Sequence, residues 1–297
     1  MNRYLIFLFI TLYFPVRCQF IQDTIRFIAL GDSYTIGQSV DKSDTWPNQF
    51  IDSLFGLGFY IERNDVLATT GWTTGKLLQA LNDSDLKQDY NLVSILIGVN
   101  NFYQNQPVGT FRLELSNIID AALTLTNQDT GALFLITIPD YGYTPFGESQ
   151  KEVISANTNL YNQIKDSTAK EYGIPLVDIT PISRNGIIDP DLVAKDGLHP
   201  SEKQYRLWVN MVIEELINDF VIETEEVKNK MDYTFVQNGK KFKLSSTNEG
   251  FCEIYDLSGR TIKRFDLNKI FNLSSGVFLF RITIGSQTFF HKVIVRN

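Results

Sequence analysis

Three residues of this chain have side chains that together can carry out acyl transfer: Ser33, Asp196 and His199. A serine hydroxyl is a weak nucleophile until a base takes its proton, and histidine is the usual base because it titrates near neutral pH. His199 is the only histidine in the first 222 residues, and Asp196 lies three residues before it. A carboxylate at this spacing can hold the imidazole in the tautomer that accepts the serine proton. The pattern therefore predicts a Ser33 nucleophile, a His199 base and an Asp196 that orients the base.

Acyl transfer also needs fixed hydrogen-bond donors for the negative oxygen of the tetrahedral intermediate. The candidates are the backbone N–H groups of Ser33 and Gly71 and the side-chain amide of Asn100, because each follows a predicted strand. The chemistry requires no cofactor. With two cysteines and two histidines in the whole chain, no Cys/His metal site is expected.

Taken singly, the stretches that carry these residues are typical of ordinary turns and helix caps. Gly-Asp-Ser, for example, commonly ends a strand and starts the next helix. Together they favour catalysis, because all of them fall where predicted strands end or a final helix begins. These stretches are Gly31–Tyr34, Thr70–Thr73, Gly98–Asn101 and Asp196–Pro200.

The elements that must position these residues alternate between strand and helix from Ile25 to about Ile222. Short apolar runs predict strands at Ile25–Leu30, Tyr60–Leu67, Leu92–Ile97, Ala132–Ile138 and Pro175–Ile179. Helical periodicity predicts helices at Trp46–Leu57, Gly75–Leu81, Phe111–Leu125, Val153–Tyr172 and Ser201–Phe220. Such alternation indicates a parallel sheet covered on both faces, with ligands at the carboxyl ends of its strands.

At these residues the chain resembles the SGNH, or GDSL, hydrolase family. The family's four blocks occur in order: "GDSY" at Gly31–Tyr34, the glycine at Gly71, "GVN" at Gly98–Asn100 and "DGLH" at Asp196–His199. Asn101 stands where the third block commonly has an aspartate, and the first block ends in tyrosine rather than leucine. The resemblance covers about residues 25–222.

The resemblance implies a three-layer α/β/α fold with a five-stranded, mainly parallel sheet of the flavodoxin-like type. It implies that Ser33 is the nucleophile, that His199 is the base and that Asp196 orients the base. It also implies an oxyanion hole made by Ser33, Gly71 and Asn100.

An aromatic loop, Ile138–Gly147, follows the fourth predicted strand. Its Tyr141, Tyr143 and Phe146 are candidates for the wall of an acyl or alcohol pocket, because such pockets are mostly apolar. Ordinary surface packing of these three side chains is an equally good interpretation.

The N-terminus predicts export. Met1–Arg3 carries a positive charge and Tyr4–Phe14 is an apolar run too short to span a bilayer, which is typical of a signal peptide over residues 1–18. We therefore expect a secreted or cell-surface protein that passes through the periplasm and has no transmembrane segment in its mature form. The net charge of −7 argues against nucleic acid as a partner.

The chain changes character after the catalytic domain expected at residues 19–222. Residues 223–230 are charged and aperiodic, which predicts a linker, and residues 231–297 show short strands broken by turns. This last part carries ten Lys and Arg against five Asp and Glu, whereas the rest carries 17 against 29. It resembles the C-terminal β-sandwich sorting domain of proteins exported by the type IX secretion system of Bacteroidetes, which implies the outer-membrane secretion machinery as a partner. A carbohydrate-binding β-sandwich is the alternative.

The sequence thus predicts a secreted serine esterase that hydrolyses acyl esters through an acyl-enzyme. Its substrate is a small-molecule, glycan or lipid ester. One alternative is that the same site transfers acyl or acetyl groups, or cleaves acetyl esters on a polysaccharide. The other is a non-catalytic surface binding protein with the same fold.

Overall fold

The computed structural model describes residues 24–57, 59–222, 233–238, 240–256, 259–285 and 287–295. The predicted signal peptide (1–18) and the predicted linker (223–230) lie outside these residues, and the domain limits stay predictions. None of the described helices combines the length and the apolar character that crossing a bilayer requires.

The apolar runs of the first part form one five-stranded sheet in the order β2-β1-β3-β4-β5, with all neighbouring strands parallel. Its strands are β1 (Thr24–Gly31), β2 (Tyr60–Ala68), β3 (Leu92–Leu96), β4 (Leu133–Ile136) and β5 (Leu176–Val177). Every residue of β3 and β4 is buried, as expected for parallel strands covered on both faces. The predicted flavodoxin-like sheet is confirmed.

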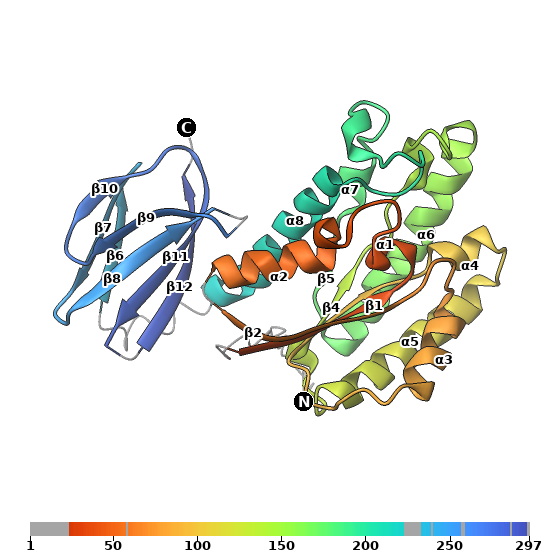
Figure 1. Ribbon diagram of the computed structural model, residues 1–297, viewed down its shortest axis with the longest axis horizontal. Helices are drawn as coiled ribbons and strands as arrows, with labels where there is room; N and C mark the ends of the chain where they lie inside the picture. Colours follow the sequence, from red (N-terminus) through yellow and green to blue (C-terminus); the bar gives the residue numbers. More distant parts are fainter. Residues whose placement is uncertain are drawn as a thin grey trace, which may run out of the picture.

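Helices cover both faces of this sheet (Figure 1). α2 and α8 pack together on one face, and α5 packs against α3 and α6 on the other. The helices are α1 (Ser33–Ile36), α2 (Trp46–Gly56), α3 (Thr74–Asp83), α4 (Val99–Tyr103), α5 (Val108–Leu125), α6 (Lys151–Tyr172), α7 (Thr180–Ser183) and α8 (Glu202–Ile222). Short 3₁₀ turns occur at η1 (Lys42–Asp44), η2 (Thr130–Ala132), η3 (Tyr141–Tyr143), η4 (Glu148–Gln150) and η5 (Pro190–Leu192). The predicted three-layer α/β/α architecture is confirmed.

The last part forms two antiparallel sheets, with the strand orders β10-β7-β6 and β12-β11-β8-β9. Its strands are β6 (Tyr233–Asn238), β7 (Lys241–Ser246), β8 (Gly250–Tyr255), β9 (Thr261–Asp266), β10 (Ile270–Asn272), β11 (Gly276–Ile284) and β12 (Gln287–Val295). Phe242 and Phe271 from one sheet meet Phe280 from the other, with ring centroids 5.9 and 5.8 Å from that of Phe280. A shared aromatic core between two sheets makes this unit a β-sandwich, as predicted.

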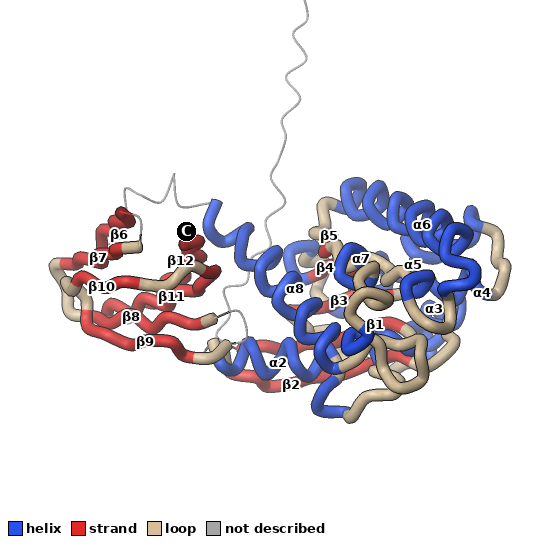
Figure 2. Tube along the Cα trace, turned by 90° about the horizontal axis from the view of Figure 1, so that it is seen from above, coloured by secondary structure: helices blue, strands red, loops and turns tan. Residues whose placement is uncertain are grey.

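The sandwich contacts the α/β unit beside α2 and α8 (Figure 2). Phe59 and Phe290 stack with ring centroids 5.4 Å apart. The backbones of Gly56 and Gly259 come so close that a Cβ on Gly56 would lie 2.5 Å from the Gly259 carbonyl oxygen. This interface lies away from the carboxyl ends of the parallel strands, where the candidate catalytic residues gather.

Candidate active site

The end of β1 delivers Ser33 to the carboxyl edge of the sheet, as the first residue of α1. Asp32 caps this short helix, because its Oδ1 accepts a hydrogen bond from the Tyr34 N–H at 3.0 Å. Gly31 allows the sharp exit: a Cβ there would lie 2.5 Å from the Leu96 carbonyl oxygen on β3. Ser33 itself is 6% exposed and lines a cavity of about 320 Å³.

His199 reaches the same cavity from the segment that precedes α8. A bridge between Val193 and Pro200 pinches this segment into a tight loop, and the Ala194 N–H donates to the His199 carbonyl at 2.8 Å. Within the loop, His199 Nδ1 lies 2.6 Å from Asp196 Oδ2. This contact occupies Nδ1 and leaves Nε2 as the ring nitrogen that can serve as a base.

The carboxylate of Asp196 is held at both oxygens. Oδ1 accepts from the backbone N–H groups of Leu198 and His199, each at 2.9 Å, while Oδ2 accepts from the Ser39 hydroxyl at 2.6 Å and contacts the His199 ring. Partial burial acts to raise the pKa of Asp196. The hydrogen bonds from Ser39, His199 and Leu198 outweigh it and hold the pKa well below its usual value. Asp196 is therefore ionised beside the imidazole at neutral pH.

Ser39 is a site residue that the sequence does not reveal, because it lies 157 positions before Asp196 and outside every motif. Its backbone has φ of 71°, a conformation that costs a residue with a Cβ roughly 1–2 kcal/mol. The sequence around Ser39 gives no indication of this contact, because a serine shortly after a helix-ending glycine is typical of an ordinary turn.

We expect Ser39→Ala to lower kcat by up to about tenfold, because Asp196 loses one charged hydrogen bond and keeps three. Ser39→Gly removes the same hydroxyl but relieves the strained φ, so it is expected to be more stable than Ser39→Ala and equally slow. Steady-state kinetics and thermal unfolding of the two variants check this pair. Wild-type rates in both would rule out a positioning role for Ser39.

Gly71 and Asn100 stand at the next two strand ends and line the same cavity as Ser33. Gly71 has φ of 80°, which requires glycine, and no described residue accepts a hydrogen bond from its N–H. The Asn100 amide donates to the Trp72 carbonyl at 3.0 Å, and its contact with Asp32 Oδ2 at 3.5 Å is long. One amide N–H therefore fixes the side chain, and the other can serve a developing oxyanion.

Asn101, which stands in place of the expected aspartate, is fully buried and joins two strand ends. Its Oδ1 accepts from the Thr74 N–H at 3.1 Å, and its Nδ2 donates to Thr74 Oγ1 at 2.6 Å and to Gln106 Oε1 at 2.9 Å. An ionised aspartate lacks the two donors that this arrangement uses. The amide thus ties the start of α3 to α4 beneath the cavity.

The predicted aromatic wall is present in part. Tyr141 and Phe146 line the cavity, together with residues that follow β1, β2 and β3 and residues of the loop before α8. Tyr143 is not among the lining residues; its ring lies under the Lys151 ammonium at 5.3 Å. Successive residues of a 3₁₀ turn are rotated by about 120°, so Tyr141 and Tyr143 in η3 point in different directions. The lining residues are Ser33, Tyr34, Gln38, Thr70, Gly71, Val99, Asn100, Tyr103, Tyr141, Phe146, Leu198 and His199.

A buried acid and a buried base lie beneath the site. Asp32 is 1% exposed, and its burial raises its pKa to about 7. Lys165 on α6 is fully buried and donates to the Ile97 carbonyl at 3.2 Å. Burial lowers the pKa of Lys165 to about 7, and the charge of Asp32 opposes this shift.

The free energy of unfolding should rise between about pH 7 and pH 10 through Lys165. In this window an unfolded lysine binds a proton that the folded one has released, so raising the pH favours the folded state. Lys165→Met should remove this contribution, which urea unfolding at several pH values measures. Lys170→Met, on the exposed side of the same helix, is the matched control and should keep the wild-type slope. Equal slopes in wild type and Lys165→Met would contradict the shift.

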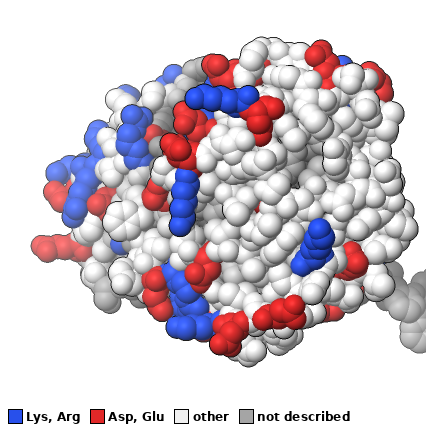
Figure 3. Space-filling view, turned by 45° about the vertical axis from the view of Figure 1, so that its right-hand side comes forward, with Lys and Arg blue, Asp and Glu red and all other residues white. Residues whose placement is uncertain are grey.

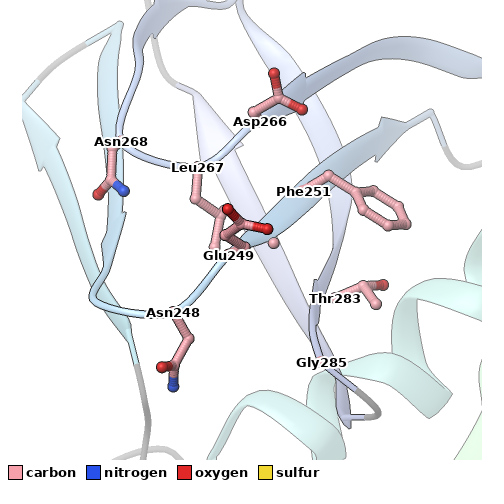
Figure 4. Close-up of a pocket in the computed structure, with 9 residues that line it drawn as sticks. Asn248, Glu249, Phe251, Asp266, Leu267, Asn268, Thr283 and Gly285 are labelled. Atoms are coloured by element: carbon pink, nitrogen blue, oxygen red, sulfur yellow. The ribbon is translucent and has the colours of Figure 1, made fainter.

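The β-sandwich has a separate hollow of its own, of about 560 Å³, between the ends of β8, β9 and β11 (Figure 4). Glu249 and Asp266 carry carboxylates there, and Phe251 flanks it. The Asn268 side chain is used to fasten the Ser246 backbone, with two hydrogen bonds at 3.0 Å. The described lining of this hollow has no serine, cysteine or histidine. Of these two cavities, the one in the α/β unit therefore has the serine and histidine of a nucleophile–base pair.

Comparisons with known proteins point to the same part of the chain. The family model described as the GDSL-like lipase/acylhydrolase family matches residues 29–207. An acetylxylan esterase of Xylanibacter ruminicola is 26% identical over 204 residues, which are 61% of this chain and 41% of that protein. The chain therefore spans about two-fifths of the length of this curated relative.

Solved structures share the fold. A lipolytic protein of the G-D-S-L family from Veillonella parvula aligns with a TM-score of 0.52 and 16% identity, over 64% of this chain and 97% of its own. A lipase/acylhydrolase from Enterococcus faecalis aligns with a TM-score of 0.51 and 21% identity, over 65% and 96%. At this level of identity the likeness shows the architecture of the α/β unit.

Proposed function

Because the chain belongs to the GDSL-like lipase/acylhydrolase family, we propose that it is a secreted serine esterase that cleaves carboxylic esters through an acyl-enzyme. The observation that carries this proposal is the 2.6 Å contact between His199 Nδ1 and Asp196 Oδ2, in a cavity that Ser33 also lines. This arrangement has a nucleophile, a base and a group that orients the base at one edge of the sheet.

In the proposed reaction His199 takes the proton of Ser33 Oγ while that oxygen attacks the ester carbonyl carbon. The tetrahedral oxyanion accepts hydrogen bonds from the N–H groups of Ser33 and Gly71 and from the Asn100 amide. His199 then gives its proton to the departing alcohol, which leaves an acyl group on Ser33. Water, deprotonated by His199, attacks this acyl group, and the carboxylic acid and free Ser33 are released.

A panel of nitrophenyl esters from acetyl to dodecanoyl tests this proposal on the purified protein. We expect turnover of part of the panel. Esters whose acyl-enzyme is hydrolysed more slowly than it forms should give an initial burst of nitrophenol that matches the enzyme concentration. A protein inactive on every ester would instead fit a non-catalytic binding protein. The same panel with an added sugar acceptor detects acyl transfer, since a transferase would form a sugar ester in place of the acid.

Acetyl esters on a polysaccharide are the second candidate substrate class. Two observations favour them. The curated relative is named an acetylxylan esterase. A second hollow shares Tyr103, Tyr141 and Phe146 with the catalytic cavity, and its described lining has no Lys, Arg, Asp or Glu.

For the β-sandwich we propose a role as the export signal of the type IX secretion system, which the sequence resemblance and its separate charge balance support. In the native host, a chain that ends near Ile222 should remain in the periplasm, as cell fractionation and immunoblotting would show. Export of that shortened chain past the outer membrane would overturn the sorting role and favour the carbohydrate-binding alternative.

A further inference from the structure

A second hollow, of about 470 Å³, adjoins the catalytic cavity. Tyr103, Tyr141 and Phe146 line both, so their side chains form the boundary that the two spaces share. The other lining residues come from α4, from the turn that follows it, from the end of η4 and from the first half of α6: Phe102, Asn105, Gln150, Val153, Ile154 and Asn157. The hollow therefore lies where the part of a substrate beyond the reacting ester would extend.

Aromatic side chains give this hollow an apolar wall. Tyr103 and Phe146 are 57% and 52% exposed, and both line this hollow, so their rings present apolar surface to solvent at one place. Tyr141 is held in place behind them, because it stacks on Phe102 with ring centroids 5.7 Å apart and an angle of 6° between the ring planes. The wall is thus formed in advance and open to solvent.

Amide side chains give the same hollow a neutral polar floor. Asn105, Gln150 and Asn157 each offer a carbonyl oxygen and an NH₂ group, so each can both accept and donate. The Asn157 side chain is already oriented by a hydrogen bond from its Nδ2 to the Val153 carbonyl at 2.9 Å. Three amides that line the same hollow as exposed aromatic rings match a ligand with hydroxyl groups on its edge and C–H groups on its face.

Charged side chains are absent from the described lining of the two hollows, although the chain carries a net charge of −7. Among the described residues that line the two hollows, none is Lys, Arg, Asp or Glu. Figure 3 shows that Lys, Arg, Asp and Glu are sparse over the broad right-hand part of the face it presents. A phosphate or carboxylate group would find no cation among these lining residues.

We propose that this second hollow is a subsite for a neutral sugar unit of a carbohydrate chain that carries the scissile ester. The sugar packs its C–H face against Tyr103 and Phe146 and hydrogen-bonds its hydroxyls to Gln150, Asn105 and Asn157. A long acyl chain fits less well, because it would desolvate these amides without replacing their hydrogen bonds to water. This inference rests on the proposed esterase function and names its substrate class.

A length series of acetylated oligosaccharides tests the subsite. We expect kcat/KM of the wild-type protein to rise about tenfold from an acetylated monosaccharide to the acetylated trisaccharide, since one or two added hydrogen bonds supply about that factor. The trisaccharide without its acetyl group should inhibit competitively. Nitrophenyl acetate, measured in parallel, reports whether the catalytic site works at all.

Gln150→Leu replaces one amide of the floor with an apolar side chain of similar size. It should reduce the trisaccharide-to-monosaccharide ratio of kcat/KM from about tenfold to about twofold, the loss of one such hydrogen bond. Gln163→Leu makes the same change on the exposed surface of α6, outside both hollows, and should keep the wild-type ratio.

The outcomes separate the subsite from the esterase proposal. If the protein hydrolyses nitrophenyl acetate but its kcat/KM for acetylated oligosaccharides does not depend on their length, the subsite proposal is wrong and the esterase proposal stands. The same conclusion follows if Gln150→Leu keeps the wild-type trisaccharide-to-monosaccharide ratio. Rates that instead rise with acyl length, and rise further in Gln150→Leu, assign the hollow to an acyl chain. A protein without activity on any nitrophenyl ester and on any acetylated oligosaccharide overturns both proposals.

Discussion

Ser33→Ala is expected to lower kcat on any ester that the wild-type protein cleaves by about 10⁴-fold or more, because no other group can form the acyl-enzyme. The change removes one oxygen from a small side chain at the start of α1, so the fold should persist. Steady-state kinetics with the most reactive nitrophenyl ester measures the loss, and circular dichroism checks the fold.

The matched control is Ser167→Ala on α6. Ser167 is exposed, and its hydroxyl donates to the Ile164 carbonyl of its own helix at 2.9 Å. This variant should hydrolyse esters at the wild-type rate. A Ser33→Ala protein that keeps more than a few per cent of wild-type activity would show that Ser33 is not the nucleophile.

His199→Ala should be about as damaging as Ser33→Ala, because the nucleophile and its base act as one unit. The double variant should be no slower than either single one, which kinetics at high enzyme concentration can measure. Asp196→Ala should be milder, since Asp196 orients the imidazole and takes no proton itself. His291→Ala is the control for histidine content: His291, the other histidine of the chain, lies in β12 of the sandwich.

A greater loss in Asp196→Ala than in His199→Ala would contradict these roles. So would a double variant that is slower than either single variant by a further large factor, because independent contributions would then multiply.

Apolar runs and turn residues were sufficient to predict the sheet. The apolar run Phe27–Leu30 predicts the strand expected at Ile25–Leu30, and β1 occupies Thr24–Gly31. The candidate catalytic residues could be predicted for the same reason. Each lies directly after a strand or before a helix, and parallel strands bring their carboxyl ends to one edge.

Contacts between segments that lie far apart in the sequence could not be predicted from apolar runs and turn residues. Ser39 donates to Asp196 only because the loop after α1 returns beside the loop before α8. Lys165 looks like one of the polar residues on a helix surface, yet α6 packs it under the sheet with no exposure. Tyr143 was expected beside Tyr141, but the rotation of a 3₁₀ turn separates their rings. In each case the outcome depends on the packing of whole elements, which no local spacing encodes.

Asn101 shows how a departure from a motif becomes understandable once its neighbours are known. The sequence shows only that an amide replaces an acid. In the structure the carbonyl oxygen of the Asn101 side chain accepts a hydrogen bond from Thr74, and its NH₂ group donates to Thr74 and Gln106. The substitution is therefore matched to its surroundings, and it keeps Asn100 beside the cavity.

Labelling with a serine-directed ethyl nitrophenyl phosphonate tests the central claim most directly, because the reagent needs an activated serine and no particular substrate. Intact mass spectrometry of the wild-type protein should find one adduct, and peptide mapping should place it on Ser33. Ser33→Ala should remain unlabelled, and His199→Ala should label far more slowly. An adduct on another residue, or equal labelling of wild type and Ser33→Ala, would contradict the assignment of Ser33 as the nucleophile.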